Sequence, residues 1–204
     1  KRQAQADAAQ RERMRRALQQ ARAPKPNAQP RMTPAQRERK LSDDAALARV
    51  PGNRHDHIKR VLDNGAMGVV VPMVNSRQEA EDAVAAMLYP PIGNRSVGGS
   101  VHALNFGTSA NDYYEHANEE LLVVLQCEHI QAVENADAIF SVPGIDAIFV
   151  GPNDLAASMR TKDNKVPSAK ATKEAMDHIL ATCKKHGVAP GLRTGSADEA
   201  NARI

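Results

Sequence analysis

The apolar stretches AMGVVVPMV (residues 66–74), LLVVLQCE (121–128) and DAIFVG (146–151) are the strongest structural signals in the sequence. Each is an almost unbroken run of aliphatic residues, which is typical of a strand that is covered on both faces of a parallel sheet. Shorter apolar runs at 45–50 and 188–193 add one strand before them and one after. We therefore expect about five strands that run parallel to one another.

Helical patterns fill the intervals between these strands, at residues 54–64, 76–88, 111–119, 130–140 and 170–186. Asn53 is a candidate cap for the first helix, because its side chain can accept hydrogen bonds from free backbone N–H groups. Ser76 and Glu79 have the spacing of a capping box at the start of the second helix. Gly187 stands at the position where a helix commonly ends.

Alternating strands and helices predict an α/β fold with a parallel sheet, either doubly wound or closed into a (β/α)8 barrel. No GxGxxG motif follows the first strand, so the main support for a dinucleotide-binding fold is missing. The P-loop pattern, GxxxxGK followed by Ser or Thr, is also absent from the sequence. The residues alone leave both architectures open.

Composition bounds the class of protein. The chain has 204 residues, of which 42% are hydrophobic and 25% charged, as in ordinary soluble globular proteins. Only 3% of the residues are aromatic. No apolar run approaches the roughly 20 residues of a membrane-spanning helix, so no membrane partner is expected. The two cysteines, Cys127 and Cys183, cannot build a disulfide framework, so we expect a reducing, cytoplasmic compartment.

Basic charge is concentrated in residues 1–40, which hold 12 of the 27 Lys and Arg residues and 3 of the 24 Asp and Glu residues. The rest of the chain is acidic. The segment has almost no branched apolar residues, so we expect a disordered tail. An RNA-binding or membrane-surface arm and an organelle-targeting peptide are the alternatives. Nucleic acid is disfavoured as a partner, because no aromatic residue lies between the charges.

Polar side chains stand at the carboxyl ends of the predicted strands, where parallel α/β proteins place their active groups. Arg49 ends the first strand, Gln126 and Glu128 end the third, and Asp154 directly follows the fourth. Glu128 and Asp154 offer the carboxylate oxygens that a hard divalent cation prefers. Singly, each residue has a plain structural explanation, such as a solvated carboxylate or a helix-capping turn. Their placement at one edge favours a metal-binding active site.

The chain resembles the HpcH/HpaI family of pyruvate-dependent class II aldolases in four segments, RVPGN…HIKRVLDNGAMGVVVPMVN, YPPIGNRSVGG, VVLQCE and VPGIDAIFVGPNDLAASM. The resemblance covers about residues 45–204. It implies a TIM (β/α)8 barrel, a hexamer built from dimers, and cleavage of a 4-hydroxy-2-oxo acid to pyruvate and an aldehyde. It also implies a divalent metal, Mg²⁺ or Mn²⁺ in the first place, with Co²⁺ or Zn²⁺ as alternatives.

The resemblance implies roles for the residues that bind metal and substrate. Glu128 and Asp154 match the family's two metal ligands, and Gln126 matches its substrate-binding glutamine. The backbone N–H groups of Asn153 and Asp154 would hold the pyruvate carboxylate.

Two further residues match positions that the family uses in catalysis. Arg49 matches the arginine that stabilises the transition state, and Asp63 matches the aspartate that tunes the catalytic histidine. The loop Arg95–Gly99 would line the mouth of the same active site. The catalytic histidine itself has no counterpart here, because no histidine precedes His55.

The first two strands and the last strand of such a barrel are not recognisable in the sequence, so we expect an incomplete barrel over residues 45–204. Two functions follow. The first is a metal-dependent aldolase that acts through a stabilised pyruvate enolate. The alternative is a catalytically impaired fragment or remnant that binds divalent metal and a 2-oxo acid without turnover.

Overall fold

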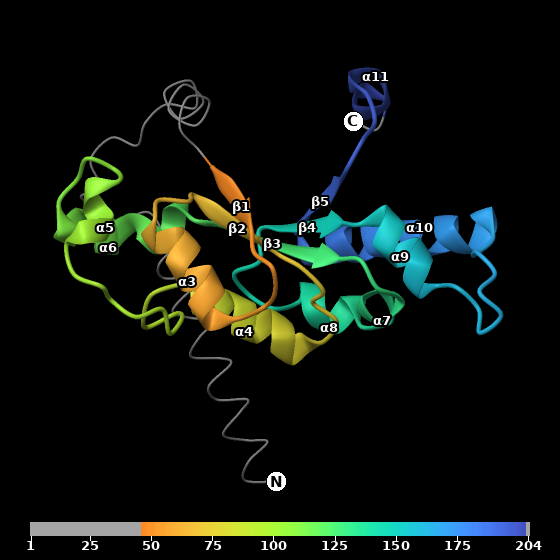
Figure 1. Ribbon diagram of the computed structural model, residues 1–204, viewed down its shortest axis with the longest axis horizontal. Helices are drawn as coiled ribbons and strands as arrows, with labels where there is room; N and C mark the ends of the chain where they lie inside the picture. Colours follow the sequence, from red (N-terminus) through yellow and green to blue (C-terminus); the bar gives the residue numbers. More distant parts are fainter. Residues whose placement is uncertain (1–45, 203–204) are drawn as a thin grey trace, which may run out of the picture.

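Five short strands form the centre of the computed structural model, which describes residues 46–202 (Figure 1). They are β1 (Leu47–Arg49), β2 (Gly68–Val71), β3 (Leu122–Cys127), β4 (Ala147–Val150) and β5 (Ala189–Leu192). Each lies inside one of the apolar runs that predicted it. The tail predicted over residues 1–40 lies outside the described residues.

The five strands make one parallel sheet whose spatial order is the order of the chain, β1-β2-β3-β4-β5. A doubly wound sheet reverses its strand order at a switch point, whereas the strands of a (β/α)8 barrel follow one another around the barrel. The parallel α/β class is therefore confirmed. Of the two architectures that the residues left open, the strand order agrees with five consecutive units of a barrel, and the described strands form an open sheet.

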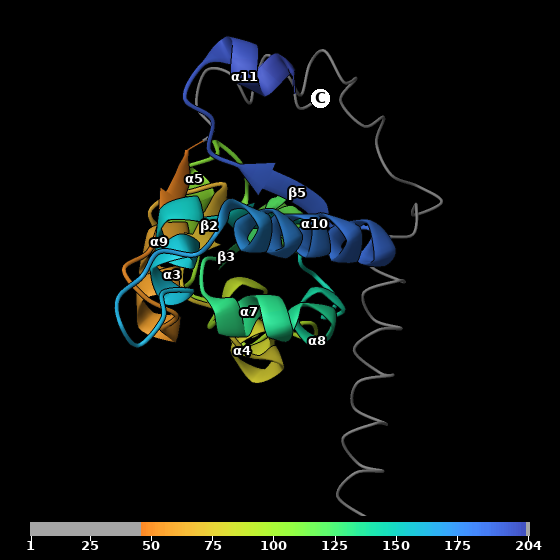
Figure 2. The same ribbon diagram turned by 90° about the vertical axis from the view of Figure 1, so that its right-hand side faces the viewer.

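Nine helices are described between residues 46 and 202: α3 (His55–Asp63), α4 (Arg77–Met87), α5 (Val101–Leu104), α6 (Ala110–Glu120), α7 (Ile130–Glu134), α8 (Ala136–Phe140), α9 (Pro152–Ser158), α10 (Ala169–His186) and α11 (Ala197–Asn201). Figure 2 shows α4, α7 and α8 together beneath the sheet, with α10 running alongside and α11 standing apart at the far end of β5. None of these helices has the length and apolar character needed to cross a membrane.

Two of the predicted helix ends are confirmed. Ser76 and Glu79 form both halves of the capping box at the start of α4. Gly187 ends α10 with φ of 68°, in the left-handed region that glycine enters without a steric penalty.

Two other helix details were predicted wrongly. Asn53 does not cap α3; its side-chain amide donates to the Glu79 carbonyl at 2.8 Å, so it ties the β1–α3 connection to α4. The helix predicted over residues 130–140 is broken at Asn135, which has φ of −96° and ψ of 8°. The Asn135 side chain donates to the Asn75 carbonyl at 2.8 Å, and this long-range contact lies where α7 ends and α8 begins.

The two faces of the sheet differ in exposure. On one face, Val69, Leu125 and Ile148 are at most 1% exposed, and they belong to the main core that the helices complete. On the other face, Leu47 is 52% exposed and Leu122 is 38% exposed. The register pairs both of them with Gly68, so they line one row across the sheet. Helices therefore cover one face, which is the arrangement on the outside of a barrel.

Candidate active site

Arg49, Gln126 and Glu128 form a connected polar cluster at the carboxyl edge of the sheet. The Arg49 Nε donates to the Gln126 Oε1 at 2.6 Å. The Gln126 Nε2 in turn donates to the Glu128 Oε2 at 3.0 Å. The Arg49 Nη2 also lies 3.8 Å from the Glu128 Oε1, which gives the cluster an ion pair. These three residues, predicted to share an edge, are thus brought into direct contact.

The cluster has a buried side and an open side. The Glu128 side chain is 2% exposed, whereas the Arg49 side chain is 57% exposed. A buried carboxylate needs donors to offset its lost hydration, and the Met73 backbone N–H supplies a further one at 3.0 Å from Oε1. The guanidinium of Arg49 therefore lies where a ligand from solvent can reach it, next to a carboxylate that the protein keeps in place.

Asp154 and Asn153 lie in the first turn of α9, directly after β4 and its following residue Gly151, and both are exposed. Buried Leu155 fixes this helix in the core. The Ser158 hydroxyl, which accepts from the Ile130 backbone N–H at 2.9 Å, ties α9 to α7. Because β3 and β4 are hydrogen-bonded neighbours, the carboxylates of Glu128 and Asp154 follow adjacent strands at the same edge.

The donor set suits a hard divalent cation. Two carboxylates from adjacent strand ends are the oxygen ligands that Mg²⁺ and Mn²⁺ prefer, and they leave positions for water and a chelating substrate. Within residues 46–202 no group of three or more His, Cys, Asp and Glu side chains is arranged to hold a metal.

Asp63 lies apart from this cluster, at the amino-terminal edge of the sheet. Helix α3 begins after the carboxyl end of β1 and returns the chain to the opposite edge, where Asp63 is its last residue. Its carboxylate accepts from the Arg95 Nη2 at 2.8 Å and from the Lys59 ammonium. Burial alone would raise the pKa of Asp63, but hydrogen bonds from Lys59 and Arg95 outweigh it and hold the pKa below its ordinary value. Within one chain, Asp63 does not meet Arg49, and its assigned role stays a prediction.

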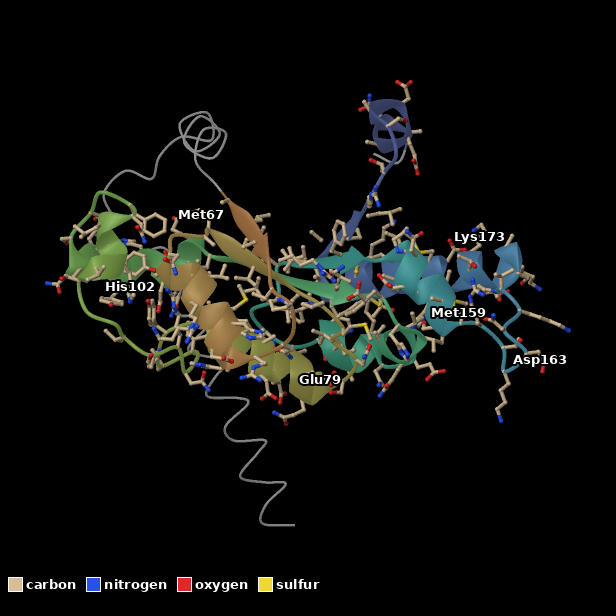
Figure 3. All side chains as sticks on the ribbon, in the orientation of Figure 1. Met67, Glu79, His102, Met159, Asp163 and Lys173 are labelled. Carbon is tan, nitrogen blue, oxygen red and sulfur yellow. The ribbon has the colours of Figure 1, made fainter. Side chains whose placement is uncertain are left out.

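The loop Arg95–Gly99 was expected at the mouth of the site, but within one chain Arg95 lies away from Arg49 and Glu128, so this role, like that of Asp63, stays a prediction. Arg95 is fully buried at the amino-terminal edge, between Asp63 and the Tyr89 ring, whose centroid is 4.5 Å from the guanidinium carbon. His102 lies beside them, its Nε2 3.6 Å from the Asp63 Oδ1. Figure 3 shows His102 at the opposite end of the molecule from Met159, which follows α9. The reason is topological, because a loop between a helix and the next strand lies at the amino edge.

The sequence profile of the HpcH/HpaI aldolase/citrate lyase family matches residues 5–202. The chain belongs to this family. Among curated proteins, a 5-keto-4-deoxy-D-glucarate aldolase of Escherichia coli is 41% identical over 153 residues, which are 75% of this chain and 59% of that protein. The chain thus spans about three fifths of the length of such relatives.

Solved structures agree with this assignment. An HpcH/HpaI aldolase from Desulfitobacterium hafniense superposes with a TM-score of 0.69 at 28% identity, over 82% of this chain and 64% of that one. An HpcH/HpaI aldolase/citrate lyase family protein from Burkholderia cenocepacia gives a TM-score of 0.67 at 35% identity, over 76% and 61% of the two chains. The fold and the family are therefore shown by sequence and by structure.

Sequence reasoning missed two residues that contact Glu128. Met73 donates through its backbone, which any residue type can do, so its side chain carries no signal. Gly151 lies so close to Glu128 that a Cβ there would be 2.7 Å from the Glu128 Oε2. Gly151 could be recognised in the sequence as the residue between β4 and Pro152. Its close approach to the carboxylate of Glu128, at the end of β3, could not.

Proposed function

We propose that this chain is a divalent-metal-dependent lyase that cleaves a 4-hydroxy-2-oxo acid to pyruvate and an aldehyde. The observation that carries the proposal is the cluster of Arg49, Gln126 and Glu128 at the carboxyl edge, with Asp154 on the adjacent strand end. Membership of an aldolase/citrate lyase family supports the reaction class.

The metal site would use Glu128 and Asp154. When bound, a divalent cation acts as a Lewis acid toward the carboxylate and keto oxygens of a 2-oxo acid. The Glu128 carboxylate is already oriented by the Met73 N–H and by Gln126, so it requires no rearrangement of the protein to present its remaining lone pairs. Mg²⁺ or Mn²⁺ fits an all-oxygen site best.

Arg49 would stabilise the negative charge that develops on the substrate. In the cleavage direction the C4 hydroxyl gives its proton to water, the C3–C4 bond breaks as the aldehyde C=O forms, and the bonding electron pair passes to the pyruvate enolate. Water then returns a proton to C3 of the enolate, which gives pyruvate. An exposed guanidinium held by Gln126 on one side and Glu128 on the other can donate to the enolate oxygen without moving far. The backbone N–H groups of Asn153 and Asp154, in the first turn of α9, would hold the pyruvate carboxylate.

The test is pyruvate formation from a 4-hydroxy-2-oxo acid in the presence of Mn²⁺ or Mg²⁺, with and without EDTA. Metal-dependent release that is lost in Glu128→Ala and in Asp154→Ala is the expected result. Release that EDTA leaves unchanged, or that survives in both variants, would overturn the proposal. Lys165→Ala, an exposed lysine far along the chain from the cluster, serves as the matched control.

The second candidate function is binding of metal and 2-oxo acid without turnover, which the lack of any histidine before His55 supports. Exchange of the pyruvate methyl protons in D₂O separates the two. Enolisation produces exchange even without an aldehyde partner, so metal-dependent exchange favours the lyase. Binding of Mn²⁺ and pyruvate with no exchange favours the second candidate.

Self-association is part of the proposal. The resemblance to the family implies a hexamer built from dimers. Light scattering coupled to gel filtration gives the mass of the assembly, and a monomer at working concentration would refute this part alone.

A further inference from the structure

The Glu128 carboxylate is fixed by two residues that have no assigned role. The first is Met73, which follows β2 and donates its backbone N–H to the Glu128 Oε1 at 3.0 Å. Met73 has φ of 54°, in the left-handed region. Among residues 46–202 the only other non-glycine there is Asn164, and asparagine tolerates that conformation better than most residues.

The left-handed backbone conformation of Met73 goes with the hydrogen bond from its N–H to Glu128, and not with the packing of its side chain. Met73 as a whole is 47% exposed, so core packing does not account for this conformation. The left-handed turn comes just two residues after Val71, the last residue of β2, and it places the N–H of Met73 against a carboxylate 55 residues away along the chain. Residues held in sparsely populated conformations tend to occur at functional sites, where the surrounding structure maintains them.

The second residue is Gly151, which lies between β4 and α9. A Cβ at this position would be 2.7 Å from the Glu128 Oε2 and 2.8 Å from the Glu128 Cβ, closer than such atoms approach one another. The Gly151 N–H donates to the Cys127 carbonyl at 3.3 Å, so the two strand ends are in contact here. Gly151 is also the residue before the turn of α9 that carries Asp154. Its lack of a side chain therefore lets the end of β4, which leads into the turn that carries Asp154, approach the Glu128 carboxylate.

We propose that Met73 and Gly151 are positioning residues for Glu128, and that they set the affinity of the site for its divalent cation. This inference rests on the proposed metal site. The Met73 N–H engages one oxygen and the Gln126 amide engages the other, so the carboxylate is held in one orientation. Gly151 sets how close the end of β4 comes to that carboxylate.

The first experiment measures Mn²⁺ affinity of the full chain by electron paramagnetic resonance. Met73→Val keeps the N–H but disfavours positive φ, because a β-branched side chain is rarely found there. We expect a loss of roughly 10–100-fold in affinity, as for other residues that orient metal ligands. Met73→Gly keeps the N–H and adopts positive φ freely, so its affinity should match that of the parent.

Gly151→Ala tests the second residue and should also weaken Mn²⁺ binding. Its matched control is Gly52→Ala, because Gly52 lies in the connection after β1 at the same edge and a Cβ there meets nothing within 4 Å. Should Gly151→Ala fail to fold, Met73→Val and Met73→Gly decide the inference by themselves. Equal affinity in Met73→Val and the parent would overturn it and leave the proposed function standing.

The second experiment needs no metal. Amide hydrogen exchange, read by NMR on the metal-free chain, should show a protected Met73 N–H that loses its protection in Glu128→Ala but keeps it in Asp154→Ala. A Met73 N–H that exchanges freely in the parent would overturn the inference. If the parent binds no Mn²⁺ at all, the proposed function fails, and the amide measurement still decides whether Met73 holds Glu128.

Discussion

Replacing Asp63 by alanine should destabilise the protein strongly, because it leaves the Arg95 charge buried without a carboxylate. Arg95 is fully buried, with its Nη2 2.8 Å from the Asp63 Oδ1. Its Nε and Nη1 are buried with no hydrogen-bond partner among the described residues. Its other contacts are the Tyr113 hydroxyl at 3.3 Å and the Tyr89 ring. Removing one partner of a buried pair costs about 3–5 kcal/mol.

The lower end of that range applies here, because the Asp63 side chain is 15% exposed and the pair is therefore not fully desolvated. A loss of about 3 kcal/mol corresponds to a fall in Tm of about 6–12 °C for a domain of this size. Urea unfolding followed by circular dichroism measures the free energy, and a thermal scan measures Tm.

The matched control is Asp137→Ala. That carboxylate also has two partners, Lys185 and His186, but its side chain is 64% exposed, so its loss should leave the unfolding free energy nearly unchanged. A loss below about 1 kcal/mol in Asp63→Ala would refute the reasoning, since it would mean that Arg95 does not depend on this carboxylate.

The same carboxylate predicts a pH dependence. The folded pKa of Asp63 lies below the ordinary value of 3.8, so the unfolded chain binds its proton first as pH falls. The stabilisation is complete above that ordinary value and is lost as pH falls through the lower folded pKa. The difference in unfolding free energy between the parent and Asp63→Asn should therefore become smaller as pH falls below 3.8. A difference that stays constant from pH 7 down to that acid range would contradict this prediction.

Three further predictions concern the core and the helices. Ile148 is fully buried in β4, and Ile148→Ala should lower the unfolding free energy in a urea titration by about 3–4 kcal/mol. Leu180 is 41% exposed, and Leu180→Ala should lower it by less than about 1 kcal/mol. Ser76→Ala removes the capping hydroxyl of α4 and should cost about 1 kcal/mol, with Ser76→Gly restoring most of it. Burial raises the pKa of Cys127 to about 12 and that of Cys183 to about 11, so neither thiol should react with a disulfide reagent at pH 8 until the protein unfolds. Rapid modification of the folded protein would contradict this.

The sequence predicted the elements whose signals are local. A parallel strand buried by helices is a run of apolar residues, so β2, β3 and β4 were visible as such runs. Capping at Ser76 depends on residues three apart and was equally readable. The contact of Arg49 with Gln126 followed from a general rule, that polar residues ending parallel strands meet at one edge.

The rest depended on contacts between distant segments. Local propensity allows asparagine within a helix, so a single helix was predicted across Asn135. The helix is instead broken there into α7 and α8, where the Asn135 side chain donates to the Asn75 carbonyl. The family resemblance placed the loop Arg95–Gly99 at the entrance of the active site, but α4 returns the chain to the amino-terminal edge of the sheet, so within one chain Arg95 lies at that edge. The left-handed backbone of Met73 has no local sequence signal, because glycine or asparagine would ordinarily stand there.

The order of the strands has a consequence for how the chain assembles during synthesis. Among the described strands, each one from β2 to β5 pairs with the strand made just before it, so none of these four must wait for a partner from later in the chain. The sheet can therefore grow in one direction as the polypeptide leaves the ribosome, each new unit adding to a finished edge. Between the described strands, the longest segment of chain separates β2 from β3, and it holds α4, α5 and α6. Since closing a longer loop costs more entropy before any contact compensates it, pairing of β3 with β2 should be the slow step of assembly.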